Sequence, residues 1–580
     1  MFLFDWFRSF LPLHNPIGFG AADFLELALA SLGVAMVLLR ARFQEAARRF
    51  AGRTGWCMLL LALLPVVLRL ALLWRFPAPT PGGADDFSYV LLADTLRHFR
   101  LANPVHPLHQ FFEAVFVLQE PSYSSTFPMG QGLILALGWT LFGHPWAGVV
   151  ISVAALCALS YWMLRAWTSP GWALAGGLLA VAAFGPLNQW MNLYWGGAVS
   201  ASAGCLIFGA LPRLKQTWRT RDAVLLGAGL GLQTLARPYE SVFVALAVAW
   251  FFGRDWLRLP TSRRAAALAA VAFLPALLLI LAQNRQVTGS YTTLPYQVSR
   301  YQYGVPAPFT FQPNPPPHRA LTEEQDLVYR AQVAVTEEAL DLGFMGRLWQ
   351  RVRFYRFFFL APLYLALPAF LLALGEWRFR WAALAIGLLA LGSNVYPYFY
   401  PHYVAAAACL FLLVSVSALD RLTRIPWLAG AAHVILFLCG FQFLFWYGIH
   451  LAGNERMLFA MTRYESAAFI DYGDPEGRIA IGKRLADAPG RQLVFVRYSA
   501  THMFHEWIHN AADPDAARVV WAADLGAAEN QKLRRYYPGR KAWLVEPDAR
   551  PPLLIPYELA PPPLPLIGRD DAPPPAPASR

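Results

Sequence analysis

Charge is scarce in this sequence. Only 14% of its 580 residues are Asp, Glu, Lys or Arg, and 57% are hydrophobic, whereas an ordinary soluble domain carries roughly 25% charged residues. A chain of this composition has too few charged side chains to cover a water-exposed surface, which excludes the soluble globular class. Apolar stretches of about 20 residues, the length that crosses a bilayer core, recur from Gly55 to Ile449. We therefore predict an all-α polytopic membrane domain over residues 1–449, with about eleven or twelve transmembrane helices.

Cysteine is also scarce, and neither a nucleotide-binding loop nor an internal repeat is visible. The five cysteines all lie in apolar segments without the spacing of metal ligands, which argues against a disulfide framework and a zinc site. The segment Phe24 to Leu39 is a doubtful span because Asp23 and Glu26 stand at its start. It lacks the basic region and cleavage site of a removable signal peptide. The sequence leaves a requirement for a divalent metal open.

The charge that is present is mostly basic, with a formal net charge of +12. The basic residues gather in short links between apolar segments, which is the pattern of membrane topology and not of a nucleic-acid-binding stripe. These links mark the inner side: Arg40 to Arg53, Arg213 to Arg221, Arg254 to Arg264, Arg378 with Arg380, and Arg421 with Arg424.

The segments that alternate with these links are predicted to lie outside the membrane. They include two long outer loops, residues 76–142 and 283–356, and short turns around Tyr194, Arg237 and residues 396–403. Long loops translocate largely regardless of their charge, so the arginines of the second loop do not contradict this assignment. Parity requires that the apolar run from Phe127 to Phe142 does not span fully, and we expect a helix at the outer interface there.

After Ile449 the hydropathy falls and a small α/β outer domain is predicted over residues 450–559. Short β-rich runs predict strands at Leu493 to Val496, Val519 to Trp521 and Ala542 to Val545, and a helix is expected over Glu529 to Tyr537. Residues 560–580 are rich in proline and poor in packing side chains, which predicts a disordered tail.

Two adjacent carboxylates, Asp85 and Asp86, stand in the first outer loop where a helix is expected to begin. Asp is a favoured N-cap and stabilises the positive end of a helix, which explains the pair without any chemistry. A carboxylate held beside the membrane is also suited to act as a general base on a hydroxyl acceptor. Both interpretations stay open, and they are compatible if one Asp caps the helix while the other acts as the base.

Arg237 interrupts an apolar hairpin between two inner links, so the topology places it on the outer side with Asp85. A leaving lipid phosphate needs cations or hydrogen-bond donors, and Arg is suited to bidentate contact with it. Snorkelling at the end of a span, or an ion pair with Glu240, is the alternative for Arg237.

Two aromatic outer turns supply further candidates. His402 lies in the turn Tyr396 to Tyr403 and could contact phosphate, while Asn192, Tyr194 and Trp195 offer an amide and aromatic faces of the kind that line sugar sites. An aromatic belt at the membrane interface explains these turns equally well.

Histidines are found in the first outer loop (His106 and His109, with Glu113) and in the tail, where His502 precedes His505-Glu506-Trp507-Ile508-His509. The last segment has the spacing of a zinc-protease motif. The flanking residues predict a short connecting segment and no third ligand is evident, which argues against metalloprotease chemistry.

Taken in order, the motifs resemble the GT-C superfamily of polytopic glycosyltransferases, including its protein O-mannosyltransferase-like and aminoarabinose-transferase-like members. The resemblance rests on Asp85-Asp86-Phe87-Ser88-Tyr89, then the stretch Tyr123 to Gly130, Leu141-Phe142-Gly143, Arg237-Pro238 and Pro401-His402-Tyr403. It covers residues 76–419. The chain departs from the pattern where Asp86 replaces Glu and His402 replaces the usual Arg.

The resemblance implies a glycosyltransferase that moves a sugar from a polyprenyl-phosphate donor to a glycan, lipid or protein acceptor. It implies Asp85 as the base with Asp86 beside it, Arg237 and His402 at the donor phosphate, and a site facing the periplasm of a bacterial inner membrane. We list Tyr89 and Glu240 with Asn192, Tyr194 and Trp195 as substrate-lining. A transporter or flippase of lipid-linked saccharide is the main alternative, although transporters usually show internal symmetry that this chain lacks. A third alternative is a non-catalytic membrane scaffold whose active unit is the tail.

Overall fold

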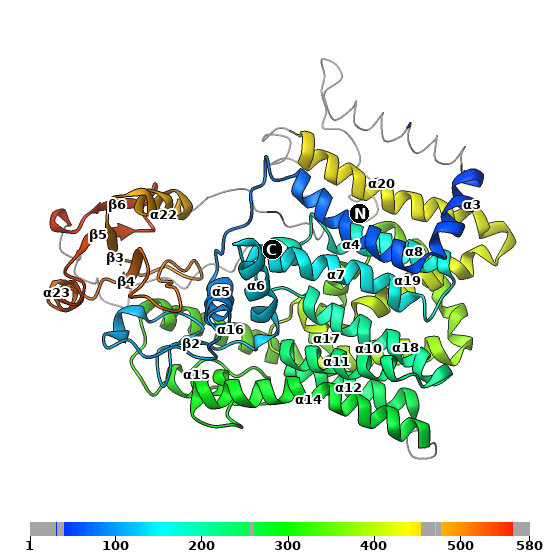
Figure 1. Ribbon diagram of the computed structural model, residues 1–580, viewed down its shortest axis with the longest axis horizontal. Helices are drawn as coiled ribbons and strands as arrows, with labels where there is room; N and C mark the ends of the chain where they lie inside the picture. Colours follow the sequence, from blue (N-terminus) through cyan, green and yellow to red (C-terminus); the bar gives the residue numbers. More distant parts are fainter. Residues whose placement is uncertain (1–30, 32–39, 254–259, 454–469, 471–476, 561–580) are drawn as a thin grey trace.

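The computed structural model describes residues 40–253, 260–453 and 477–560, together with residues 31 and 470. The doubtful segment Phe24 to Leu39 and the Pro-rich tail fall, apart from residues 31 and 560, outside the described residues. Most of the chain forms a helical bundle whose longer helices run along the long axis of the molecule, with a small sheet at one end (Figure 1).

The bundle and its loops contain many helices of unequal length. The α-helices are α3 (Arg40–Ala51), α4 (Thr54–Ala71), α5 (Ala84–Arg97), α6 (Met129–Phe142), α7 (Trp146–Leu164), α8 (Pro170–Phe184), α9 (Gln189–Asn192), α10 (Ala198–Thr217), α11 (Thr220–Ala236), α12 (Pro238–Phe252), α14 (Pro260–Thr288), α15 (Pro295–Tyr303), α16 (Glu323–Asp341), α17 (Gly343–Phe354), α18 (Trp377–Ser393), α19 (Ala408–Thr423) and α20 (Ala429–Ala452). Short 3-10 helices are η1 (His109–Phe112), η2 (Tyr355–Phe358), η3 (Ala361–Leu365), η4 (Leu367–Gly375), η5 (Pro401–Ala407) and η6 (Pro426–Leu428), and β1 (Val117–Leu118) pairs with β2 (Ser124–Ser125).

Five of the described helical segments are long and apolar enough to cross a membrane: Thr54–Ala71, Trp146–Leu164, Pro260–Thr288, Pro401–Thr423 and Pro426–Ala452. Shorter apolar helices include α6, α8 and α12. Large apolar side chains are exposed along these helices, such as Leu63 and Val67 of α4 at 51% and 60%. Such surfaces suit lipid and not water, so the chain is an integral membrane protein. The count of eleven or twelve spans stays a prediction.

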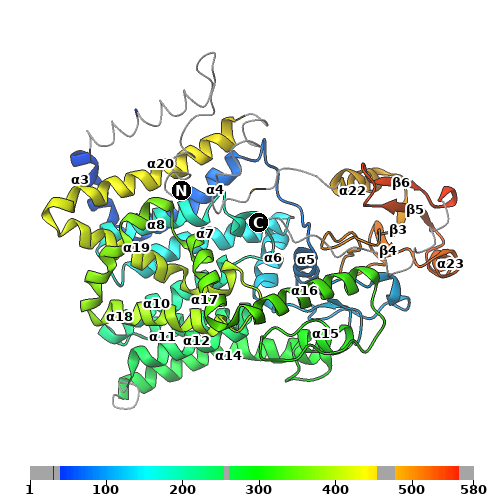
Figure 2. The ribbon, with the colours of Figure 1, turned by 180° about the vertical axis from the view of Figure 1, so that it is seen from behind.

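The predicted outer segments gather at one end of the bundle. α4 runs from the link Arg40 to Arg53 into the first outer loop, and α11 runs from the link Arg213 to Arg221 to Arg237. Figures 1 and 2 show α5, α15 and α16 between the bundle and the sheet. The helix expected at the outer interface is α6, and Figure 1 shows it lying across the direction of α7 at this end.

The described C-terminal region contains a small sheet with helices beside it. Its sheet has the order β4-β3-β5-β6, in which β4 (Val519–Ala523), β3 (Arg491–Val496) and β5 (Arg540–Glu546) are parallel and β6 (Leu553–Pro556) is antiparallel. The three predicted strands and the predicted helix, which is α23 (Ala527–Tyr536), are confirmed. β6, α22 (Arg478–Asp487) and η8 (Tyr557–Leu559) were not predicted.

The first outer loop completes the core of this domain. Phe111 and Phe112 of η1 pack in one cluster with Phe495 of β3, Leu533 of α23 and Leu544 of β5. The Phe111 ring is fully buried and its centroid lies 6.4 Å from that of Phe495. Burial of these apolar side chains attaches the C-terminal domain to the loop that directly follows α5. The domain is therefore held at the end of the bundle where α5 lies.

Replacing Phe111 by Ala is expected to loosen this attachment. Truncating a buried Phe costs about 3–5 kcal/mol, so the F111A protein should unfold at a lower temperature and its C-terminal domain should be cut faster by trypsin in detergent. Phe99 is fully exposed, and F99A is the matched control. Equal Tm values and equal digestion rates for the two variants would show that η1 does not hold the domain.

Candidate functional site

The acidic pair lies in the first turn of α5, where Gly83 is the N-cap residue. Asp86 is buried, and its Oδ2 accepts a hydrogen bond from Gly82 N at 3.4 Å while its Oδ1 accepts one from Tyr194 N at 3.0 Å. A carboxylate at this position that reaches back to the N–H groups before the helix is half of a capping box. Asp86 thus caps α5 and ties the first outer loop to the turn around Tyr194.

Asp85 differs from its neighbour. Its side chain is half-buried, and among the described residues no group hydrogen-bonds to its carboxylate. Burial and the adjacent Asp86 raise the pKa of Asp85 to about 7, although Arg237 acts in the opposite direction. Burial raises the pKa of Asp86 to about 6, less far because backbone N–H groups and Arg478 favour its charged form. Asp85 is therefore the carboxylate poised to exchange a proton near neutral pH.

Arg237 stands at the corner between α11 and α12, within electrostatic range of Asp85. Its guanidinium lies over the ring of Tyr403, 5.0 Å from the centroid. No described group accepts a hydrogen bond from this guanidinium, and Glu240 is not within ion-pair distance of it; instead Glu240 accepts a hydrogen bond from Tyr396 Oη at 3.2 Å. The five N–H donors of Arg237 are therefore available to an anion.

The aromatic turn between α18 and η5 closes the site on the other side. His402 is buried with its ring centroid 5.0 Å from that of Trp195, and it lies within electrostatic range of Arg237. Tyr398 and Tyr400 lie within electrostatic range of Asp85. Residues from four separate segments thus meet at one end of the bundle, among them Asp85, Arg237 and His402, which the topology predicted to lie on the same side of the membrane.

Two arginines that the sequence did not single out hold this turn. On α17, Arg351 donates hydrogen bonds to the carbonyls of Ser393 and Tyr396, and Arg347 Nε donates to the carbonyl of Asn394 at 3.2 Å. Both arginines are buried. Their signal in the sequence is a pair of basic residues four positions apart on the outer side, where the positive-inside rule gives them no role.

The turn around Tyr194 is built differently from the expectation of sugar contact. Asn192 is 1% exposed; it accepts a hydrogen bond from Arg69 Nε at 2.8 Å and donates to two backbone carbonyls. Tyr194 is fully buried and donates its hydroxyl to the Pro79 carbonyl at 2.7 Å. These side chains brace the turn from beneath and present no free polar atom to a sugar. Trp195 alone of the three is partly exposed, beside His402.

Tyr89 and Glu240 lie deeper than the pair of charges. Tyr89 is 5% exposed, stacks on Phe127 at 4.5 Å between centroids, and is within electrostatic range of Asp85 and Arg237. Burial raises the pKa of Tyr89 to about 12, so its hydroxyl stays protonated at pH 7. It is placed as a neutral donor beneath the two charged groups, and Glu240 offsets part of the charge of Arg237.

A close helix approach sets the position of Arg237. A Cβ on Gly130, in the first turn of α6, would lie 2.7 Å from the backbone nitrogen of Ala236. Only a glycine lets α6, which packs on α5, come this near to the end of α11. The motif that begins at Tyr123 therefore ends in the residue that brings Arg237 toward Asp85.

Replacing Gly130 by Ala is expected to push the end of α11 away from α6, because the added Cβ would overlap backbone atoms of Leu235 and Ala236, and to lower stability by about 1–3 kcal/mol as well as activity. Misplacing a reacting group by about 1 Å costs roughly 100-fold in rate, so any activity that depends on Arg237 should show a kcat lower by about that factor. Gly171, whose added Cβ would meet nothing within 4 Å, provides the control variant G171A. Unchanged kcat in G130A would contradict this positioning role.

The C-terminal domain contacts α5 directly. The His509 ring stacks on the Phe87 ring of α5 with 3.9 Å between centroids, and the Arg478 guanidinium lies 4.3 Å from the centroid of the same Phe87 ring. Asp94 of α5 accepts a hydrogen bond from Ala512 N at 2.7 Å. Burial, and then Arg478, lower the pKa of His509 well below its usual value, so the stacked ring is neutral at pH 7. The helix that carries Asp85 is therefore fixed along its length by the outer domain.

The zinc-protease-like spacing serves packing in this structure. The segment from His505 to His509 is not helical, and Glu506 accepts hydrogen bonds from Tyr498 Oη at 2.9 Å and from Ile508 N at 2.8 Å. His502 pairs with Asp548 at 2.8 Å. In the part of the chain that is described, no group of three or more His, Cys, Asp or Glu side chains is arranged to hold a metal ion.

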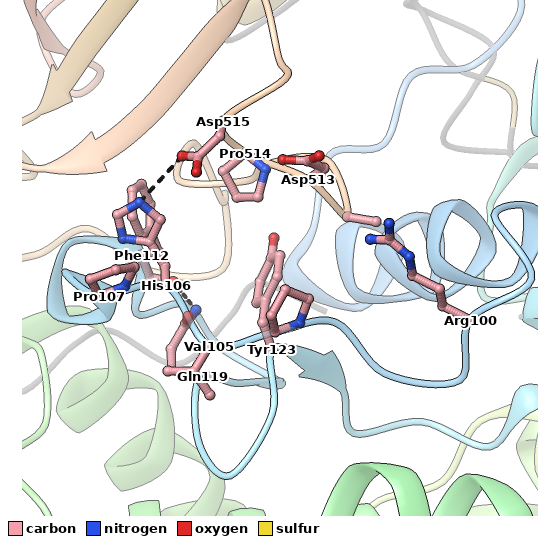
Figure 3. Close-up of a pocket in the computed structure, with 12 residues that line it drawn as sticks. Arg100, Val105, His106, Pro107, Phe112, Gln119, Tyr123, Asp513, Pro514 and Asp515 are labelled. Atoms are coloured by element: carbon pink, nitrogen blue, oxygen red, sulfur yellow. Dashed lines mark hydrogen bonds and ion pairs between the residues drawn. The ribbon is translucent and has the colours of Figure 1, made fainter. Parts of the chain in front are cut away.

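The other histidine cluster lies where the first outer loop meets the domain. A cavity of about 290 Å³ lies there. Figure 3 shows His106 and Tyr123 of the loop facing Asp513 and Asp515. His106 Nε2 lies 3.5 Å from Asp515 Oδ1. Glu113 pairs with Arg319 at 2.6 Å, which links the two long outer loops. These residues join loops and domain and lie apart from the acidic pair on α5.

No family model and no curated protein matches the chain. Among solved structures it is similar to ArnT from Cupriavidus metallidurans in the apo state, with 14% identity, a TM-score of 0.47, and coverage of 85% of this chain and 93% of that one. A crystal structure of the same ArnT bound to undecaprenyl phosphate gives 15% identity and a TM-score of 0.44, with coverage of 85% and 93%.

The chain is also similar to the oligosaccharyltransferase AglB from Archaeoglobus fulgidus in complex with an inhibitory peptide and a dolichol-phosphate. The identity is 13% and the TM-score 0.42, over 85% of this chain and 69% of that one. At these values the similarity alone assigns no activity to this chain.

Proposed function

We propose that this protein is a membrane glycosyltransferase that moves a sugar from a polyprenyl-phosphate donor to a hydroxyl acceptor at the outer face of the membrane. The observation that carries the proposal is the meeting of Asp85 and Arg237. Both side chains are partly buried and come from different elements. Among the described residues, neither side chain has a hydrogen-bond partner.

The reaction uses these two groups for two different needs. Asp85 takes the proton of the acceptor hydroxyl as its oxygen attacks the anomeric carbon. The bond from that carbon to the phosphate oxygen breaks, and polyprenyl phosphate leaves with one additional negative charge. Arg237, with Tyr89 and His402 nearby, meets this charge in a site where water is scarce and hydrogen bonds to an anion are strong. A direct displacement of this kind inverts the anomeric configuration.

The proposal predicts how the rate depends on pH. Because the pKa of Asp85 is raised to about 7, the base is protonated below that pH and ionised above it. We expect kcat/KM for transfer from a labelled polyprenyl-phosphate sugar to fall about ten-fold for each pH unit below the pKa. A rate that stays constant between pH 5 and pH 8 would show that no group with such a pKa acts as the base.

A further inference from the structure

A second polar cavity lies at the other end of the bundle. It has a volume of about 490 Å³ and lies where α4 and α11 begin and where α7 and α10 end. Arg237 follows the far end of α11, and a helix of 17 residues is about 25 Å long. The cavity therefore opens near the membrane face opposite to the proposed transfer site, next to two of the predicted inner links.

Three guanidinium groups make this cavity cationic. Arg165, Arg213 and Arg221 line it, and Arg165 and Arg221 lie within electrostatic range of Arg213. The Nε of Arg165 is buried and has no hydrogen-bond partner among the described residues. The first turn of α4 begins at Thr54 on the cavity wall, and its N-cap residue provides no side-chain cap, so the positive end of this helix lies at the cavity.

One carboxylate breaks the pattern. Asp222 lines the same cavity and is 1% exposed, yet both of its oxygens are buried without a hydrogen-bond partner in the described part of the chain. It lies 3.6 Å from Arg221 Nε, beyond hydrogen-bonding distance. A buried carboxylate without donors is costly, so a ligand that brings N–H donors to Asp222 would gain from it.

We propose that this cavity binds the phosphoethanolamine headgroup of a membrane phospholipid, with the phosphate toward Arg165 and Arg213 and the ammonium group toward Asp222. Basic pockets between membrane helices on the inner side are suited to lipid headgroups. A purely anionic headgroup would leave Asp222 without a donor, and a quaternary choline has no N–H to give it.

The surroundings favour a lipid over a soluble phosphate. Trp162 and Leu225 contribute apolar walls to the cavity. On the same helices and within two turns of it, Leu59 of α4 and Val224 of α11 are 47% and 41% exposed. Acyl chains of a lipid held by its headgroup would cover such side chains, whereas a soluble ligand would not.

The test uses the full chain purified in detergent and incubated with an equimolar mixture of phosphatidylethanolamine, phosphatidylcholine and phosphatidylglycerol with the same acyl chains. Native mass spectrometry then measures which lipids stay bound. Because hydrogen bonds to a charged group are among the stronger ones, we expect phosphatidylethanolamine to be retained about ten-fold over the other two. D222N should abolish this preference, R165Q should weaken binding of all three lipids, and R264Q, which alters an exposed inner arginine outside the cavity, should change neither.

Equal retention of the three lipids by the unaltered protein would overturn the proposal. A preference for phosphatidylglycerol would overturn it as well, because this headgroup carries hydroxyl groups but no ammonium group, so the preference would show that an ammonium group is not what the cavity selects. Free O-phosphoethanolamine is added in a separate arm. Displacement of the lipid by an equal concentration of this soluble compound would refute a lipid site, and retention of the lipid supports one. None of these results depends on transferase activity.

Discussion

Replacing Asp85 by Asn should lower kcat for sugar transfer by about 100- to 10,000-fold, the usual contribution of a general base, while the donor still binds. Asn has nearly the same shape as Asp, and Asp85 makes no hydrogen bond with the described residues that the change would remove. The Tm of D85N should therefore match that of the unaltered protein. The measurement is transfer from labelled polyprenyl-phosphate sugar by membranes that contain equal amounts of each protein.

D86N is the matched variant for comparison. The Asp86 carboxylate accepts hydrogen bonds from the backbone, whereas the Asp85 carboxylate accepts none from the described residues. Asp86 uses both oxygens on backbone N–H groups of Gly82 and Tyr194, and an amide offers only one acceptor oxygen. D86N should therefore lose about 1 kcal/mol of stability for the lost hydrogen bond. Its Tm should fall together with its rate. Full activity in D85N would rule out Asp85 as the base, whatever D86N does.

The second large effect is expected at Arg237. Removing a charged donor from a site where negative charge develops costs about 100- to 1,000-fold in kcat, so R237Q should fall by that amount. R237K keeps the charge but loses the planar fork that binds two oxygens at once. It should lie between R237Q and the unaltered protein, with a raised KM for the donor.

R330Q provides the control for this series. Arg330 lies on the outer loop and is 66% exposed in its side chain, where it pairs with Asp326, and exposed ion pairs contribute little to stability. Its activity should be unchanged. If R237Q were as active as R330Q, the interpretation of Arg237 as a snorkelling arginine would replace that of a phosphate ligand.

The chain order of charges was enough to predict that these residues lie at the same end of the bundle. The positive-inside rule and the parity of spans depend only on where basic links fall, and they placed Asp85, Arg237 and His402 on one side although they lie far apart in the sequence. The short β-rich runs of the C-terminal strands are equally local, so β3, β4 and β5 could be predicted from them.

What could not be predicted depends on which way a side chain points within a turn. Asn192 and Tyr194 have the chemistry of sugar-binding residues, but Arg69 and the Pro79 carbonyl take up their polar atoms. Arg351 shows the same difficulty from the other direction. Its long side chain reaches from α17 to backbone carbonyls that lie 42 and 45 residues further along the chain. No local sequence pattern encodes such a contact.

The most direct test of sugar transfer follows the labelled donor in detergent solution, where no membrane separates two compartments. The purified protein in detergent is given labelled polyprenyl-phosphate sugar together with a membrane extract as the source of acceptor. We predict that the label moves into an acceptor while free polyprenyl phosphate appears in equal amount, and that D85N blocks both. A donor that stays intact here, yet crosses the bilayer when the same protein is placed in vesicles, would contradict transfer and identify a flippase.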